Sequence, residues 1–312
     1  MPFLMLSLVA LSLLPAAVSS APASSKPSIP QMKTQSIEVL VHARKVKFPD
    51  QKPKIENEQV LVPLRFVSDK LGGKLDLKGN EITIVKGDRT VKLVIGAQSA
   101  TVNGKTIALG VPAQAVNGRT YVPLRFISEA LGEKVEWDKV NRFVWIGSKD
   151  VPKLEDVVEA VDLKPYLKYF KGGKIVDLIL DNDGYSEVFT KARIIKEEDF
   201  PLVIAKDIYY RVDYALVDGK EFTRAITTDK GVMGRSFYLL QAEQPLKYRG
   251  EASYLRESIG DIRIHYNLVV SSDDVIEHGI KNYSDLKLKD VEYIGIHAPS
   301  DAVILVENYL DK

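Results

Sequence analysis

A twelve-residue stretch occurs twice in this chain of 312 residues, sixty positions apart. The copy at 61–72 reads LVPLRFVSDKLG, and the copy at 121–132 reads YVPLRFISEALG. A repeat at fixed spacing defines a structural unit before any residue propensity is considered. In each copy a Pro precedes and a Gly ends a run with apolar residues at i, i+3 and i+7, which predicts a short amphipathic helix. The repeat indicates architecture rather than chemistry.

The segments around each helix repeat as well. After the helices, residues 74–85 and 134–146 alternate as half-buried strands do. Asn103-Gly104 separates two short strands, and Asn117-Gly118 leads into the second helix; Asn-Gly is the strongest short-range hairpin signal. The predicted unit is therefore a hairpin, a helix and a strand pair, used twice between about 36 and 147.

Two side chains of the second copy are predicted to be structural rather than part of a ligand site. Arg125 and Glu129 are spaced i, i+4 and can form an ion pair along the helix. Trp137, on the following strand, is large enough to close the core beneath the helix. Its counterpart Leu77 is smaller, so we expect the second repeat to be the better packed of the two.

The run from Asn117 to Gly132, followed by Val-Glu-Trp-Asp at 135–138, resembles the copper amine oxidase N-terminal-like domain, also called the stalk domain. That module is common in secreted and surface proteins of Gram-positive bacteria. The resemblance covers about residues 36–147, and the first copy departs from it at His42-Ala43 and Glu58-Gln59, where Asn-Gly and Gly-Arg are usual. It implies a small α/β module that supports or spaces other domains, and not an oxidase.

Copper and other cofactors are not expected. This sequence contains no Cys and only 4 His. It has no His-x-His pair. In the catalytic domain of copper amine oxidases, the resemblance would imply Asn-Tyr followed by Asp or Glu, but here Asn282-Tyr283 and Asn308-Tyr309 are followed by other residues. A tight Cu(II) site therefore has no obvious set of ligands.

The first residues predict export. An apolar run from Phe3 to Leu14, too short to span a bilayer, precedes small residues near Ala21, which indicates a signal peptide at 1–21. Residues 22–35 are rich in Pro and Ser and are interpreted as a flexible tether. The absence of Cys suits an extracytoplasmic bacterial protein. We expect an extracellular or cell-wall-associated protein with no transmembrane segment after signal cleavage.

Charge is divided unevenly along the chain. Residues 1–147 hold 20 Lys plus Arg against 12 Asp plus Glu, whereas residues 148–312 hold 23 against 30. A basic module would gain a diffuse, salt-sensitive attraction to anionic wall polymer. The alternative is that scattered lysines simply maintain solubility. No Arg-rich helix or aromatic-basic alternation argues for nucleic acid as a partner.

The second half, 149–312, resembles no family we recognise and is predicted to be β-rich. A short helix is expected at 154–161. The segment 175–180 is interpreted as a strand that leads into the turn Asp181-Asn182-Asp183-Gly184. A hairpin is expected at 208–227 around Asp218-Gly219, and further strands at 236–241, 262–271, 291–296 and 302–307. This pattern predicts a sandwich, or a sheet backed by one helix.

Candidate chemical groups in this half are few, and each has a structural alternative that we favour. Asp181 to Gly184 lacks the spacing of a calcium loop, and His265, His278 and His297 lack metal-ligand spacing. Paired carboxylates at Asp273-Asp274 or Glu197-Glu198-Asp199 are the type that glycoside hydrolysis uses. A row of Tyr could stack on sugars, or simply pack; its members are Tyr209, Tyr210, Tyr214, Tyr238, Tyr248, Tyr254 and Tyr266.

The sequence thus predicts an α+β protein with a signal peptide (1–21), a tether (22–35), a stalk domain of two repeats (36–96 and 97–148) and a β-rich domain (149–312). The expected function is that of a non-enzymatic surface protein whose stalk presents a binding domain, with cell-wall glycan or a surface protein as its partner. The alternative is an extracytoplasmic hydrolase with an acidic active site in 150–312. No catalytic, cofactor-binding or metal-binding residue is assigned.

Overall fold

The computed structural model describes residues 36–180, 188–217, 219–228, 237–249, 254–276 and 283–309. These residues form a mostly β structure with mostly antiparallel sheets, which confirms the coarse fold prediction. The predicted signal peptide and tether, and the turn at 181–184, lie outside the described residues. Within the described part, no helix is both long enough and apolar enough to cross a membrane.

Two helices of the amino-terminal module coincide with the repeated sequence. Helix α1 spans Leu64–Lys70 and helix α2 spans Leu124–Ala130, each directly after a Pro. Each ends before a Gly in the left-handed region, Gly72 at φ 75° and Gly132 at φ 93°. Since left-handed backbone excludes most side chains, Gly fixes where each helix stops.

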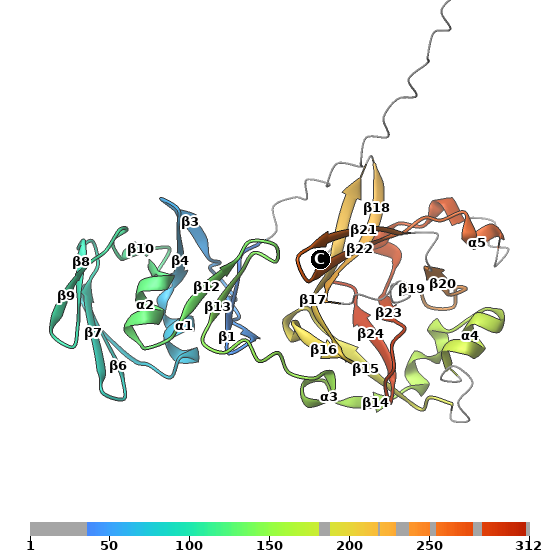
Figure 1. Cartoon of the computed structure of the whole chain (residues 1–312), viewed down its shortest axis with the longest axis horizontal. Helices are drawn as coiled ribbons and strands as arrows, with labels where there is room; N and C mark the ends of the chain where they lie inside the picture. Colours follow the sequence, from blue (N-terminus) through green and yellow to red (C-terminus); the bar gives the residue numbers. More distant parts are fainter. Residues whose placement is uncertain are drawn as a thin grey trace, which may run out of the picture. The chain divides into compact units, whose positions relative to one another are not determined.

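Thirteen short strands surround these helices in three sheets (Figure 1). They are β1 (Glu38–Val41), β2 (Arg44–Lys45), β3 (Lys54–Glu56), β4 (Gln59–Pro63), β5 (Lys74–Lys78), β6 (Glu81–Lys86), β7 (Arg89–Val94), β8 (Ser99–Val102), β9 (Lys105–Ala108), β10 (Gln114–Val116), β11 (Arg119–Pro123), β12 (Val135–Asp138) and β13 (Phe143–Ile146). The sheet orders are β12-β13-β1-β2, β10-β11-β4-β3 and β5-β6-β7-β8-β9.

Pairing between distant segments closes the module. The first strand, β1, pairs in parallel with the last, β13, and β4 pairs with β11 from the other copy. Figure 1 shows β1 and β13 side by side. One hydrophobic core then joins all three sheets and both helices, with Leu64 and Val67 of α1 and Leu124 and Ile127 of α2 buried in it.

The hairpin turns keep their geometry in both copies, although the residues differ. Asn103-Gly104 and Asn117-Gly118 have φ between 49° and 82°. His42-Ala43 and Asn57-Glu58 adopt the same left-handed conformation, with φ between 46° and 61°. A non-Gly residue there costs about 1–2 kcal/mol, so the surrounding strand pairs must hold these two turns in place.

The elements of the second half are mainly strands. They are α3 (Leu154–Val157), β14 (Ala160–Asp162), η1 (Lys164–Tyr169), α4 (Gly173–Leu180), β15 (Lys191–Ile195), η3 (Glu197–Asp199), β16 (Leu202–Ile204), β17 (Asp207–Val217), β18 (Lys220–Thr227), β19 (Phe237–Leu240), β20 (Lys247–Arg249), β21 (Tyr254–Ile259), β22 (Ile262–Leu268), α5 (Asp273–Ile276), η5 (Tyr283–Asp285), η6 (Leu288–Asp290), β23 (Tyr293–Ile296) and β24 (Val303–Glu307). The predicted hairpin and the four later strands are all present, with β17 pairing β18 in antiparallel register.

Two sheets of this half pack against each other. Their orders are β14-β15-β24-β23-β19-β20 and β16-β17-β18-β22-β21. A shared core joins Ile195 and Ile304 of the first sheet to Val212 and Ala225 of the second. A second cluster, which includes Leu305 on β24 and Ile179 on α4, covers the outer face of the first sheet. The domain is therefore a sandwich that also carries a helix.

Two local predictions in this half were wrong in part. Residues 175–180 belong to helix α4 rather than to a strand, and Val176 and Ile179 are buried on one helical face. A continuous apolar run of this length fits either a buried strand or a buried helix, and packing against the sheet decides it. The helix expected at 154–161 ends at Val157, and Ala160–Asp162 instead forms strand β14 on the edge of the sheet.

Candidate functional site

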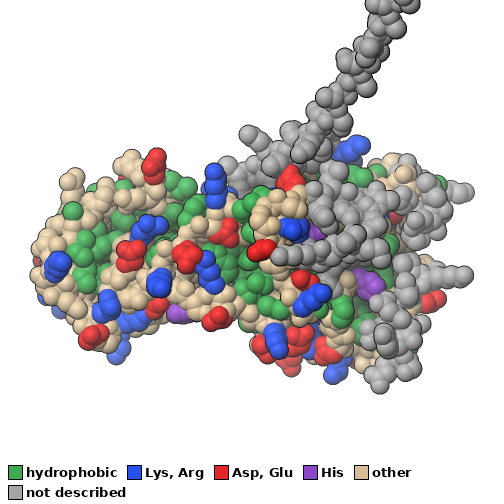
Figure 2. Space-filling view, in the orientation of Figure 1, with side chains coloured by type: hydrophobic (Ala, Val, Ile, Leu, Met, Phe, Trp, Pro, Cys, Tyr) green, Lys and Arg blue, Asp and Glu red, His purple; other side chains and the backbone are tan. Residues whose placement is uncertain are grey.

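A groove of about 790 Å³ lies in the amino-terminal module. Residues of β3, the β3–β4 turn, β4, β9, α2, β12 and β13 line it, and most of them are apolar. Figure 2 shows hydrophobic side chains reaching the surface between charged ones over this module. The lining consists of Ile55, Glu58, Gln59, Val60, Ile107, Ala108, Leu109, Gly110, Pro123, Leu124, Arg125, Phe126, Glu129, Val135, Trp137 and Val144.

Trp137 lines this groove instead of closing the core, so its predicted burial was wrong. Its side chain is 42% exposed, and its counterpart Leu77 is 46% exposed. Strand β12 lies at the edge of its sheet, with Trp137 opposite Val144 of β13. The ring therefore stands beside the first turn of α2 at the surface, where Leu124 and Phe126 also reach the groove.

The buried tryptophan is Trp145, on the neighbouring strand β13. It is 4% exposed and contacts Phe143 edge-on at a ring distance of 5.8 Å. Val151 and Tyr210 pack against the same small cluster. All four residues of β13 are buried because its sheet is covered on both faces. Alternation along one strand could not show that the second face is covered.

The charged residues of the groove do not form the predicted helical ion pair. Arg125 and Glu129 both line the groove and both are exposed, as is Glu58 in the β3–β4 turn. Within the described ranges, no ion pair or side-chain hydrogen bond joins Arg125 to Glu129 or engages Glu58. Two carboxylates and one guanidinium thus remain available to a ligand.

A second, much smaller hollow of about 70 Å³ occupies the equivalent place in the first copy. Its lining corresponds to part of the large groove at a spacing of sixty: Pro63, Leu64 and Arg65 match 123–125, where strand passes into helix. Leu75 and Leu77 match Val135 and Trp137, and residues 118–120 match 58–60. The two hollows therefore occupy equivalent places in the two copies, nearly filled by side chains in the first copy and open in the second.

Phe48 and Arg119, the latter paired with Asp50, account for the filled state of the smaller hollow. Phe48 packs edge-on against Phe66 of α1 at a ring distance of 5.8 Å. The guanidinium of Arg119 lies 5.7 Å from the centre of the Phe66 ring. Arg119 Nε donates a 2.8 Å hydrogen bond to Asp50 Oδ2, and this bond lowers the pKa of Asp50. An aromatic ring and a paired cation thus cover Phe66.

Smaller residues open the second hollow. The strand registers place Val46 opposite Val39 and Ile107 opposite Ala100, so Phe48 corresponds to Leu109 in the second copy. Arg119 corresponds to Gln59, which has no positive charge. Among the described residues, no ring or cation is therefore stacked on Phe126, the counterpart of Phe66, and both phenylalanines are half-buried. The change from Gly-Arg to Glu-Gln at 58–59 was visible in the sequence, but its consequence for the opposite copy was not.

The acidic cluster at 197–199 does not form a free carboxylate pair. Glu198 forms an ion pair with Lys47 at 3.0 Å, which lowers the pKa of Glu198. Asp199 Oδ2 accepts a 2.8 Å hydrogen bond from the backbone N–H of Lys196. These contacts are structural, since they tie η3 to the amino-terminal module and cap the start of η3.

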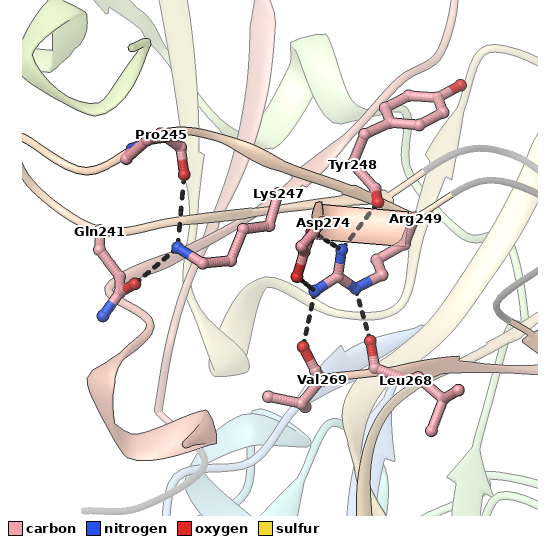
Figure 3. Close-up of polar contacts among 8 residues, drawn as sticks. All are labelled: Gln241, Pro245, Lys247, Tyr248, Arg249, Leu268, Val269 and Asp274. Carbon is pink, nitrogen blue, oxygen red and sulfur yellow. Dashed lines mark hydrogen bonds and ion pairs between the residues drawn. The ribbon is translucent and has the colours of Figure 1, made fainter. Parts of the chain in front are cut away.

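Asp274, the second candidate carboxylate, is fully buried beside Arg249 of β20 (Figure 3). Its two oxygens accept hydrogen bonds of 2.8 and 2.9 Å from the Arg249 guanidinium, which also donates to the carbonyls of Tyr248, Leu268 and Val269. Lys247 on the same strand donates to Gln241, and burial lowers the pKa of Lys247. With every donor of Arg249 engaged, this network holds α5 against two strands.

Three of the candidate tyrosines and one histidine of this half are buried packing residues. Tyr209, Tyr238 and Tyr266 are at most 2% exposed, which favours the packing interpretation over a sugar-stacking row. Burial, assisted by the charge of Glu257, raises the pKa of Tyr266 to about 12. His265 is buried in β22. In the part of the chain that the structure describes, no group of three His, Asp or Glu residues could hold a metal ion; His278 lies outside that part.

Comparison with known families gives one match. Residues 40–146 match the family model of the copper amine oxidase N-terminal domain, which confirms the resemblance for that segment only. This domain fits a non-catalytic stalk module. No curated protein matches the chain.

Proposed function

We propose that this protein is an exported, non-enzymatic surface protein that binds a ligand of the cell envelope, and that the groove beside Trp137 is its binding site. A single observation carries the proposal. The groove is large, apolar and open, and it is lined by three charged groups that form no ion pair within the described part of the chain. A concave apolar surface with a few convergent polar groups is the usual form of a ligand site.

This proposal moves the binding site from the carboxy-terminal domain to the stalk. The sequence placed the ligand on the sandwich, because of its tyrosines and carboxylates. Tyr209, Tyr238 and Asp274 are buried, and Glu198 is paired. The sandwich then supports the module, and the export predicted from residues 1–21 brings the groove to wall polymer or to surface proteins.

Co-sedimentation with purified Gram-positive cell walls tests this function. We expect the full chain to sediment with walls, and Trp137→Ala to reduce the bound fraction. Leu77→Ala is the matched control, because Leu77 is equally exposed at the equivalent place of the filled hollow; it should bind as the unchanged protein does. Equal binding by all three proteins, or binding by none, would contradict the proposal.

A further inference from the structure

We propose that the groove binds an extended segment of another polypeptide, in which a cationic side chain and a large apolar side chain lie on one face. The inference rests on the proposed function and names the class of ligand for the same site. It follows from three features of the groove: the strands at its border, the residues that fill its counterpart, and its charge.

Edge strands border the groove on several sides. β3, β9 and β12 are each the last strand of their sheet, and each contributes an apolar residue to the groove. All four residues of β9 are exposed, and Ile107 on it is 37% exposed. The outer backbone N–H and C=O groups of such a strand can pair with an added strand, while the alternate side chains of that strand enter a pocket. This border suits polypeptide backbone.

The first copy shows what kind of side chains fill this shape. There the chain's own Phe48 and Arg119 cover Phe66. In the second copy Leu109 and Gln59 take their places, so among the described residues neither a ring nor a cation is stacked on the half-buried Phe126. A partner that fills the open groove must therefore supply what the first copy supplies from within: a large apolar side chain and a cation beside it.

The charge of the groove also favours a cation. Glu58 and Glu129 line it together with Arg125, so carboxylates exceed guanidinium groups by one. In the first copy the residue equivalent to Glu58 is Gly118, so the open groove has gained a carboxylate where the first copy has none. A lysine or arginine placed over Phe126 would meet these carboxylates and the face of the ring together.

Sugars fit the lining less well. A saccharide needs hydrogen-bond partners for its hydroxyl groups as well as an aromatic platform, because polar groups that lose water without gaining a partner weaken binding. Trp137 could provide the platform and the three charged residues could pair with some hydroxyl groups, but most of the lining, including Ile55, Leu109 and Leu124, offers no polar side-chain atoms. Apolar side chains of a peptide match this lining.

A selection from random displayed decapeptides, using the full chain as bait, tests the inference. We expect enriched peptides to carry Arg or Lys two positions from a large apolar residue, since such positions share one face of a strand. In calorimetric titration of synthetic copies, replacing the cation by Gln should weaken binding about tenfold, as should Glu129→Gln in the protein. Enrichment of peptides without this pairing would overturn the inference.

The matched variant is Leu109→Phe with Gln59→Arg, which gives the second hollow the residues of the first. It should keep its unfolding midpoint and lose peptide binding, whereas Leu77→Ala should retain binding. If the double variant fails to fold, Glu129→Gln alone decides. Peptides that bind the closed variant as tightly as the unchanged protein would refute the site.

Two further results separate this inference from the proposed function. Groove-dependent binding of soluble wall glycan fragments, with no peptide enriched, would refute the peptide ligand and leave the binding function intact. A groove-dependent dimer in sedimentation equilibrium would assign the groove to a second copy of this chain instead. Failure of walls, glycans and peptides alike to bind in a groove-dependent way would overturn both proposals.

Discussion

Replacing each tryptophan by alanine should destabilise the protein to very different degrees. Trp145 is 4% exposed and Trp137 is 42% exposed. An aromatic side chain buries about 200 Å², so Trp145 removes about 75 Å² more surface from water than Trp137 does. At about 25 cal/mol per Å², this difference in burial corresponds to about 2 kcal/mol of folding free energy. Loss of a buried tryptophan costs about 3–5 kcal/mol. We therefore expect about 4 kcal/mol for Trp145→Ala and about 2 kcal/mol for Trp137→Ala.

Urea denaturation of the full chain measures this difference. The chain has 2 tryptophans, both in the amino-terminal module, so the remaining one reports the unfolding of that module in each variant. A change in midpoint without a change in slope indicates a change in stability. Equal losses, or a larger loss for Trp137→Ala, would show that the two rings are not placed as described.

Three other outcomes are expected. Asp274→Ala should cost about 3–5 kcal/mol, because it leaves a buried guanidinium without its counter-ion, and urea denaturation measures the loss. The hydrogen bond from Arg119 depresses the pKa of Asp50, so this bond stabilises at neutral pH and is lost as pH falls through that lowered pKa; Asp50→Asn should therefore flatten the decline of the melting temperature in acid. Limited proteolysis should cut first at 147–150. This segment precedes Pro152, whose carbonyl accepts a hydrogen bond from the backbone N–H of Val203 in the second half. Uniform resistance there would contradict separate folding of the two halves.

Much of the module could be predicted from the sequence because its signals are local. The Pro and Gly that bound α1 and α2 act through backbone geometry, and Asn103-Gly104 fixes its hairpin without help from distant residues. The left-handed turn at His42-Ala43 carries no such signal, since it is held by the pairing of β1 with β2 and β13.

The groove could not be predicted, because it depends on contacts between the two copies. Leu109 and Gln59 stand where the first copy has a ring and a cation beside its phenylalanine, and Gln59 comes from the other copy. Contacts at Phe126 therefore depend on residues that lie far apart in the sequence. Trp137 was misplaced for a related reason. A large aromatic residue on an amphipathic strand is usually a core residue, and only the position of β12 at the sheet edge turns Trp137 toward solvent. The helix α4 was missed because an apolar run does not reveal its period when nearly every residue is apolar.

Hydrogen–deuterium exchange with and without purified cell walls tests most directly whether the ligand contacts the groove beside Trp137. The method reports where binding occurs, whatever the ligand is. We expect slower exchange in residues 105–110, 123–126 and 135–137, which line the groove. The corresponding segments of the first copy should exchange unchanged. Protection confined to residues 149–312 would contradict the account and return the ligand to the sandwich domain.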